Sequence, residues 1–159
     1  MNKPKTNAMR MMDKENISYE LKEIPLKGGS VAVDDVHEFL GIPKGMLFKT
    51  LVTTDTLGSY FVFCLPSVEE LDLKKAARAA GVKRIEMLRQ KELFPLTGYV
   101  HGGCSPVGMK KLFPTVIDES AQKWDSIIVS AGKLGMLMEV SPKELKDMVS
   151  AEYESITKE

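Results

Sequence analysis

The sequence is poor in the residues that build disulfide frameworks and metal sites. Cys64 and Cys104 are its only cysteines, and the two histidines, His37 and His101, form no C-x-x-C or H-E-x-x-H arrangement with them or with each other. Two cysteines are too few for a disulfide scaffold, and scattered donors of this kind do not predict a zinc site. We therefore expect neither a metal nor a cofactor.

Long apolar runs and phosphate-binding motifs are also missing. No apolar run reaches the roughly 18 residues of a membrane span, and residues 1–16 contain no uninterrupted apolar core of a signal peptide. Neither G-x-x-x-x-G-K-[ST] nor G-x-G-x-x-G occurs. Because these loops cradle phosphates in nucleotide and dinucleotide enzymes, such chemistry is not predicted. The expected location is the cytoplasm, with no membrane partner.

A surplus of either charge is absent as well. Twenty-two basic residues balance twenty-two acidic ones, whereas a general DNA binder gains its affinity by neutralising phosphates with excess cations. DNA is therefore not an expected partner. One basic stretch stands out and fits two interpretations, a solvated helix face or a patch that captures a single-stranded end. It comprises Lys74, Lys75, Arg78, Lys83, Arg84, Arg89 and Lys91.

The pattern of apolar residues and turn signals predicts one domain over residues 1–159. Its strands are too closely spaced for regular βαβ units, which favours an α+β domain with a mixed, mostly antiparallel sheet curled toward a barrel. We expect helices at 6–14, 31–41, 72–81 and 141–149, and the start of a short one in 106–113. We expect strands at 18–24, 46–54, 60–66, 98–101, 115–117, 126–130 and 136–140.

Lys49 is the most unusual charge in the chain. In the predicted strand 46–54, a period of two puts Phe48 and Val52 on one face and Lys49 between Leu47 and Leu51 on the other. Such an ammonium group either extends to solvent from a sheet edge or lines a pocket. In a pocket it would be a fixed positive charge suited to a phosphate or a polarised oxygen.

The segment "GYVHGGCSPVGMKK" (98–111) concentrates glycine between two apolar stretches. Gly102 and Gly103 permit unusual backbone angles and let a ligand approach the main chain, and Ser105-Pro106 presets a turn. Successive amides directed at one point make an anion or oxyanion site. A tight turn between two strands is the alternative.

A third interpretation of this segment is a thiol enzyme. Cys104 would be the nucleophile and His101, three residues earlier, its base. A loop leaves the geometry of that pair undefined, so the sequence favours the backbone-amide interpretation. Cys64, inside the strand 60–66, is expected to be a core residue.

Four segments together resemble the YbaK-like family of aminoacyl-tRNA deacylases, which is related to the editing domain inserted in bacterial prolyl-tRNA synthetases. The similarity covers most of the chain, from about Gly41 to the last helix, and is looser over the first thirty residues. The segments are "FKTLV" (48–52), "LDLKKAARAAGVKRIEM" (71–87), "TGYVHGGCSPVGMKKLFPTVID" (97–118) and "IIVSAGKLG" (127–135).

This resemblance implies a barrel-like mixed sheet flanked by helices and an enzyme that removes a wrong amino acid from tRNA, often cysteine from tRNA charged for proline. The implied partners are the aminoacyl-tRNA 3′ end and prolyl-tRNA synthetase. The implied catalytic residues are Lys49, Gly102 and Gly103. The implied substrate-binding residues are Thr50, Ser105 and Pro106. His101 stands where relatives often carry an apolar residue, and we expect it to bind substrate as an added polar contact or proton shuttle.

Two further positions depart from the family pattern. Relatives commonly carry Arg and Asp where this chain has Leu134 and Leu137. The loss of the carboxylate leaves the amino-acid specificity open. It also keeps a rival interpretation open, in which the domain binds tRNA or a nucleotide and assists a synthetase without catalysis.

Overall fold

The computed structural model describes residues 4–26 and 33–159 of the chain. In this part the strands form two sheets, a three-stranded one in the order β1-β7-β6 and a five-stranded one in the order β4-β2-β3-β5-β8. Four of the six strand pairs are antiparallel, and β5 pairs in parallel with both β3 and β8. The strands are β1 Glu20–Glu23, β2 Phe48–Thr54, β3 Tyr60–Pro66, β4 Glu86–Met87, β5 Thr115–Asp118, β6 Ile127–Lys133, β7 Met136–Val140 and β8 Glu152–Glu154.

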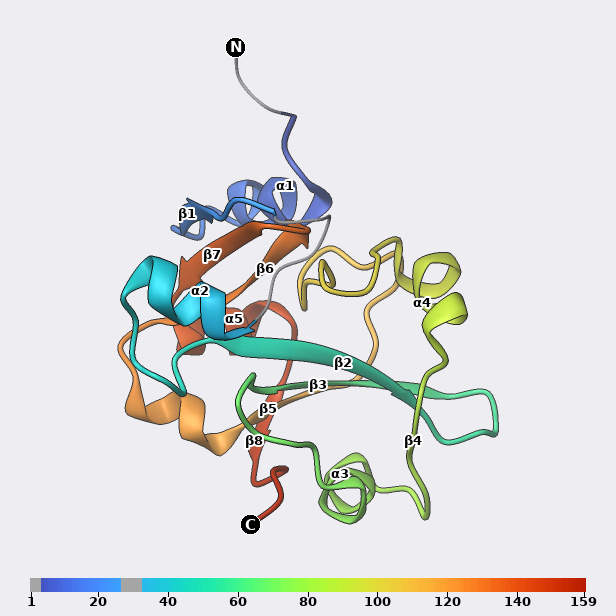
Figure 1. Ribbon diagram of the computed structural model, residues 1–159. Coiled ribbons are helices and arrows are strands. Elements are labelled where there is room, and N and C mark those ends of the chain that lie inside the picture. The colour runs from blue at the N-terminus through green and yellow to red at the C-terminus, as the bar shows by residue number, and fades with distance from the viewer. Residues whose placement is uncertain (1–3, 27–32) are drawn as a thin grey trace.

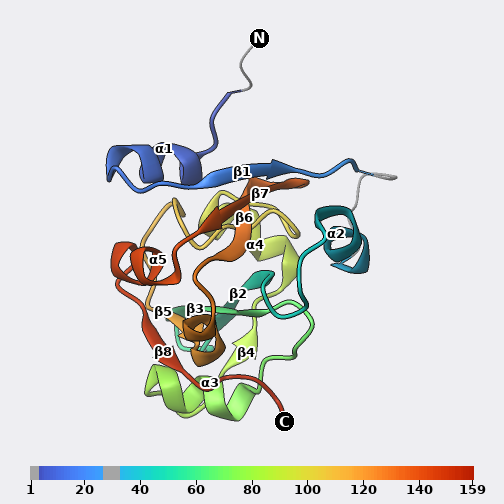
Figure 2. The same cartoon turned by 90° about the vertical axis from the view of Figure 1, so that its left-hand side faces the viewer.

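Helices flank the two sheets. Helix α1 lies against the three-stranded sheet at one end of the molecule, and α3 covers the five-stranded sheet at the other (Figure 1, Figure 2). No helix among the described residues is long and apolar enough to cross a membrane. The helices are α1 Asn7–Lys14, α2 Val33–Leu40, α3 Leu73–Ala80, α4 Gln90–Thr97, the 3-10 helix η1 Glu119–Lys123 and α5 Pro142–Met148.

Strand β3 lies in the middle of the five-stranded sheet and is buried on both faces. Val62 and Cys64 face the main core, which β6, β7 and α1 complete, while Phe61, Phe63 and Leu65 face a second core beneath α3. A strand buried on both faces reads as a continuous apolar run rather than an alternating one. Burial on both faces explains the continuous apolar sequence "YFVFCLP" of β3. The neighbouring strand β2 alternates more clearly between apolar and polar residues.

Local signals located most of the expected helices. Thr6 accepts a hydrogen bond from the Met9 amide at the start of α1, and Asp72 accepts from the Lys74 and Lys75 amides at the start of α3. Gly81 ends α3 in the left-handed conformation that glycine adopts without strain. The expected helix 31–41 is α2, although its first two residues lie outside the described part of the chain.

The predicted α+β class with a mixed, mostly antiparallel sheet is confirmed, with one difference in its curvature. The two sheets meet at a single parallel bridge between Leu47 and Ile128, so the described strands do not close into a barrel. The Ile128 amide donates to the Met46 carbonyl at 3.0 Å there. Leu47, the residue that precedes β2, consequently links the two sheets.

Two expected elements are wrong, both near the glycine segment. Residues 98–101 form no strand, because the chain there turns after α4, which ends at Gly98 in the left-handed region. Pro95 lies inside α4. Because proline is typical of helix ends, the sequence did not predict a helix here. Residues 106–113 form bends instead of a helix, with Gly108 at φ +81°.

The buried carboxylate of Asp118 joins the end of β5 to the last segment of the chain. It accepts hydrogen bonds from the amides of Ile156 and Ser120, both at 3.1 Å, and its side chain is almost fully buried. Hydrogen bonds to a charged group contribute about 1.5–3 kcal/mol each. This residue therefore anchors residues 155–158 against the sheet.

Asp118→Ala is expected to lower the free energy of unfolding by about 2–4 kcal/mol, because it leaves two amides without their acceptor. Urea denaturation followed by circular dichroism measures this change. Asp125→Ala, at an exposed position, is the control and should change stability by at most about 0.5 kcal/mol. Equal stabilities of the two variants would contradict the anchoring role.

Candidate active site

A cavity of about 300 Å³ lies where strand β2 changes partners. Strand β2 pairs with β3 along its whole length, but its other edge meets only the bridge at Leu47 and the short β4 at Thr53 and Thr54. Between these points no described strand covers residues 48–51. The strand edge therefore forms one wall of the cavity.

The remaining walls come from segments far apart in the sequence. Helix α4 contributes Leu93, and the turn after it contributes His101, Gly102 and Cys104. The rest of the lining is mostly apolar, apart from the hydroxyls of Ser67 and Ser130. The full lining is Ile24, Val36, Leu47, Phe48, Lys49, Thr50, Leu51, Ser67, Leu93, His101, Gly102, Cys104, Ser130, Gly135 and Leu137.

Lys49 lies on the β2 face predicted from the sequence and is half-buried. Its Nζ donates a 2.6 Å hydrogen bond to the backbone carbonyl of Glu69, in the turn that follows β3. Burial lowers the pKa of Lys49 below its ordinary value, although the carboxylates of Glu70 and Glu69 act in the opposite direction. Lys49 is thus not free in solvent, it has no direct ion pair among the described residues, and it lines the cavity.

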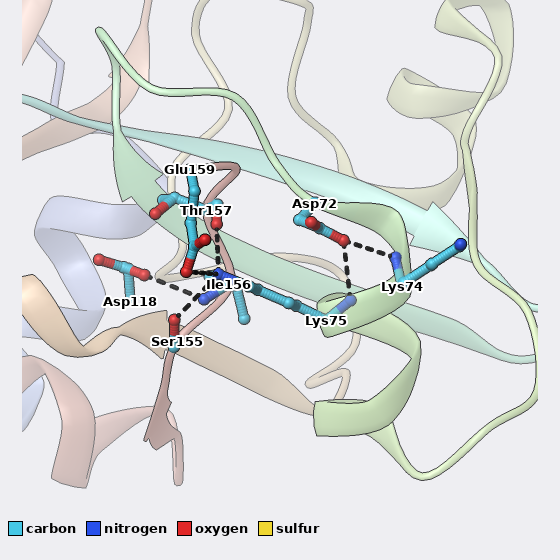
Figure 3. Close-up of polar contacts among 8 residues, drawn as sticks. All are labelled: Asp72, Lys74, Lys75, Asp118, Ser155, Ile156, Thr157 and Glu159. Carbon is cyan, nitrogen blue, oxygen red and sulfur yellow. Dashed lines mark hydrogen bonds and ion pairs between the residues drawn. The ribbon is translucent and has the colours of Figure 1, made fainter.

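The segment that holds Lys49 is itself held by residues 155–158. Leu71 forms an antiparallel bridge with Thr157, and the amides of Asp72 and Lys158 donate to the carbonyls of Ile156 and Glu70. Lys75 reaches across to the Thr157 carbonyl at 2.9 Å, whereas Lys74 points away (Figure 3). These contacts fix the Glu69 carbonyl and therefore the Lys49 side chain.

The two adjacent glycines have different environments. Gly102 lines the cavity at φ +85°, and a Cβ atom there would lie 2.7 Å from the Leu134 side chain. Gly103 packs against the backbone of Lys133 and Leu134, and its amide donates to the Val100 carbonyl at 2.9 Å. The Gly103 amide is therefore engaged within the turn, while among the described residues no hydrogen bond engages the Gly102 amide.

The other residues expected to bind substrate divide into two groups. Thr50 and His101 line the cavity. Ser105 and Pro106 are buried and do not line it, and the Ser105 hydroxyl accepts from the Val107 amide at 3.2 Å. Ser105 and Pro106 hence shape the turn from behind.

The family model of the aminoacyl-tRNA editing domain matches residues 29–148 of the chain. The chain belongs to this family. A protein of Enterococcus faecalis that bears the provisional name Cys-tRNA(Pro)/Cys-tRNA(Cys) deacylase EbsC is 46% identical over 153 residues, which are 96% of this chain and 93% of that protein. The proline--tRNA ligase of Trichlorobacter lovleyi is 26% identical over 101 residues, which are 64% of this chain and 18% of that enzyme.

Solved structures of the same fold are similarly extensive matches. The crystal structure of a candidate trans-editing enzyme for prolyl-tRNA synthetase superposes with a TM-score of 0.84 at 23% identity, covering 99% of this chain and 100% of that one. The crystal structure of the hypothetical protein APE2540 gives a TM-score of 0.87 at 22% identity, over 96% and 100% of the two chains. At these identities the likeness establishes the fold of the editing domain.

The two unusual leucines of this editing domain both adjoin the site. Leu137 lines the apolar wall of the cavity, and Leu134 packs against Gly102. Ser130 and Ser67 also line the cavity, and sequence reasoning had assigned neither a role. Ser130 lies in the segment "IIVSAGKLG" that carries the family resemblance, which is the signal that could have identified it.

The predicted basic patch is only partly available as a surface. Lys75 is bound to residues 157–159, Arg84 pairs with Glu86, and Arg89 pairs with Glu92. The other four members are exposed. They are Lys74, Arg78, Lys83 and Lys91.

Burial makes both cysteines of the editing domain poor nucleophiles. It raises the pKa of Cys104 to about 12, with a smaller contribution from Cys64, and it raises the pKa of Cys64 to about 12 as well. No hydrogen bond among the described residues joins Cys104 to His101, whose side chain is exposed. A thiolate is the reactive form, so the thiol-enzyme interpretation loses its support.

Stability should fall in alkaline solution because of these thiols. In the unfolded chain a thiol titrates near pH 8.5, so above that pH the unfolded state loses protons that the folded state keeps up to about pH 12. Each thiol should then lower the free energy of unfolding by about 1.4 kcal/mol per pH unit. Urea denaturation at pH 8, 9 and 10 measures the slope, which Cys104→Ala should make shallower. Identical slopes would show that Cys104 ionises normally in the fold.

Proposed function

We propose that this protein is a trans-acting aminoacyl-tRNA editing enzyme of the cytoplasm, which removes a mischarged amino acid from tRNA, first of all cysteine from Cys-tRNA(Pro). The observation that carries the proposal is the shared cavity of about 300 Å³, which Lys49 and Gly102 both line at the open edge of β2. The provisional name of the Enterococcus relative supports the same substrate.

The cavity suits one end of a tRNA rather than a whole duplex. Its volume is at the lower end of ligand pockets, enough for a small aminoacyl group and part of the terminal ribose. Synthetase pockets separate amino acids that differ by one small apolar group by only about 1–3 kcal/mol, so charging errors require a second site. A small cavity of this kind is suited to that second selection.

Lys49 is proposed to hold the ribose or phosphate of the 3′ end and so fix the ester. Its ammonium group already has one acceptor, the Glu69 carbonyl, which leaves two donor hydrogens for the substrate. Thr50 and His101, on the same cavity, are proposed to complete the substrate contacts.

The oxyanion that develops on the ester carbonyl is proposed to bind backbone amides of the turn. Sequence reasoning named the amides of Gly102 and Gly103, but the Gly103 amide already donates to Val100. The Gly102 amide therefore carries this role in our proposal, with the Cys104 amide as the second donor, because both residues line the cavity. Gly103, which has no side chain, instead lets Lys133 at the end of β6 pack closely against the turn.

The attacking group distinguishes a hydrolase from a lyase. Water attack on the ester carbonyl releases the free amino acid and the ribose hydroxyl of the tRNA. With a cysteinyl substrate, its own thiolate attacks instead, forming a C–S bond in a cyclic thioester as the C–O bond breaks and the ribose oxygen takes a proton. Neither route uses a nucleophile from the protein, in keeping with the raised pKa of Cys104.

Prolyl-tRNA synthetase is the proposed protein partner. The editing domain matches part of the Trichlorobacter proline--tRNA ligase, in which the corresponding region belongs to the synthetase chain itself. A free-standing domain without a net charge is expected to bind tRNA weakly on its own. Docking on the synthetase would raise its local concentration at the newly charged 3′ end.

Lys49→Ala should slow deacylation of Cys-tRNA(Pro) by about 10²-fold, because the ester is no longer held in the position needed for attack. The measurement is release of labelled amino acid from Cys-tRNA(Pro), with Ala-tRNA(Pro) alongside because it lacks the thiol needed for cyclisation. Lys143→Ala, an exposed lysine on α5, is the matched control and should act as wild type.

The same assay separates the proposal from its rival. Saturable tRNA binding by a folded wild-type protein, without multiple-turnover release from either substrate, would favour the non-catalytic binding module. Leu134 and Leu137 are the observation that keeps this second function in view, because they stand where relatives carry charged groups. Cleavage of Cys-tRNA(Pro) but not of Ala-tRNA(Pro) would favour cyclisation.

Cys104→Ala should retain deacylation within about threefold of wild type, because its buried thiol stays protonated at neutral pH. The comparison is kcat/KM for Cys-tRNA(Pro) in both proteins, with thermal denaturation to confirm that the variant folds. A loss comparable to that of Lys49→Ala in a folded variant would restore the thiol-enzyme mechanism.

A further inference from the structure

Helix α4, which lines the cavity through Leu93, also presents an aromatic ring to solvent. Phe94 is 56% exposed, although the preceding residue, Leu93, lines the cavity wall. Among the described residues, the Phe94 side chain is not one of those that pack against the main core, and it makes no cap hydrogen bond of α4. A large exposed ring on a helix that lines a substrate cavity is therefore a candidate contact for the part of the ligand that remains outside.

The ring is held in place by a lysine from the glycine segment. The Lys110 Nζ lies 5.6 Å from the centroid of Phe94 and donates to the Pro95 carbonyl at 3.2 Å. The Lys110 amide also donates to the Thr97 carbonyl at 3.0 Å, so the segment is bound to the end of α4. A cation and an aromatic face thus form one fixed unit.

The stretch of sequence that contains this unit has a surplus of basic residues. Between positions 89 and 111 the chain has four basic residues, and its single acidic residue, Glu92, pairs with Arg89. Lys91, Lys110 and Lys111 are exposed and have no carboxylate partner among the described residues. The chain as a whole is neutral, so this local surplus suits the exposed part of α4 and the segment bound to it to an anionic ligand.

We infer that Phe94 and Lys110 form a stacking platform for an unpaired base of the tRNA 3′ end, while Lys91 and Lys111 face the adjoining phosphates. An aromatic face within a basic surface is the combination that binds single-stranded nucleic acid without reading its sequence. The inference rests on the proposed function, because it places the nucleotides next to the ester bound in the cavity. Phe94 acts in binding and takes no part in the reaction itself.

The test compares a full substrate with one too short to reach the platform. Phe94→Ala should raise KM for Cys-tRNA(Pro) about 5- to 150-fold, the range of stacking on one base, and leave kcat nearly unchanged. Cysteinyl-adenosine, which lacks the preceding nucleotides, should be deacylated equally by the variant and wild type. Phe94→Tyr should keep most of the affinity, and Leu57→Ala, at a remote and more exposed apolar residue, is the control.

A binding measurement keeps the inference testable if deacylation fails. Fluorescence anisotropy of a labelled single-stranded oligonucleotide ending in CCA should show weaker binding to Phe94→Ala, and Lys110→Met should reduce the salt dependence of binding. Inactive wild type that still binds the oligonucleotide through Phe94 would overturn the proposed function alone. Unchanged binding and KM in Phe94→Ala would overturn the platform. Equal losses on cysteinyl-adenosine and tRNA, or losses seen only with synthetase present, would overturn it in favour of a structural role or a protein contact.

Discussion

The site depends on one constraint: the chain joins the two sheets at Leu47, just before strand β2, and one edge of β2 is left partly uncovered. The bridge from Leu47 to Ile128 at one end and the pairing of β2 with β4 at the other leave residues 48–51 open on one side. A strand edge in that position exposes backbone groups, and proteins usually protect such edges. Here the cavity lies against the open edge, and Lys49 and Thr50 line the cavity. The same change of partners that joins the two sheets therefore creates the binding site.

The charge on Lys49 is kept available by the kind of partner that holds it. A carboxylate in direct contact would neutralise the ammonium group, whereas the Glu69 carbonyl orients it through a dipole and leaves its charge to a ligand. Partial burial strengthens that charge toward any anion, at the cost of the lowered pKa. The carbonyl stays in place because residues 155–158 pair with the segment after it, and Asp118 anchors those residues in turn (Figure 3). A series of hydrogen bonds thus connects residues 155–158, which follow β8, to the site.

The sequence located what local patterns determine and missed what tertiary packing determines. Alternation in "FKTLV" placed Lys49 on its face, and capping residues located α1 and α3. Pro95 prevented the prediction of α4, because a proline in so short a segment argues against a helix. In the structure the helix forms nevertheless and packs on the core. The glycine pair was recognised as a place of close approach, but its spacing did not reveal that Val100 already occupies the Gly103 amide. Hydrogen-bond partners within a turn depend on backbone angles that residue types only restrict.

The apolar wall of the cavity explains why the editing reaction would need more than its own pocket to be selective. Leu137 and its apolar neighbours offer a bound side chain shape and no charge, so selection rests chiefly on excluding groups that are too large. Such a sieve separates amino acids that differ by one methylene by only about 1–3 kcal/mol, and it accepts smaller correct residues as readily as wrong ones. The remaining selectivity must come from the tRNA and from the synthetase that charges it. A domain without net charge fits that division, because it gains access to the 3′ end without holding every tRNA in the cell.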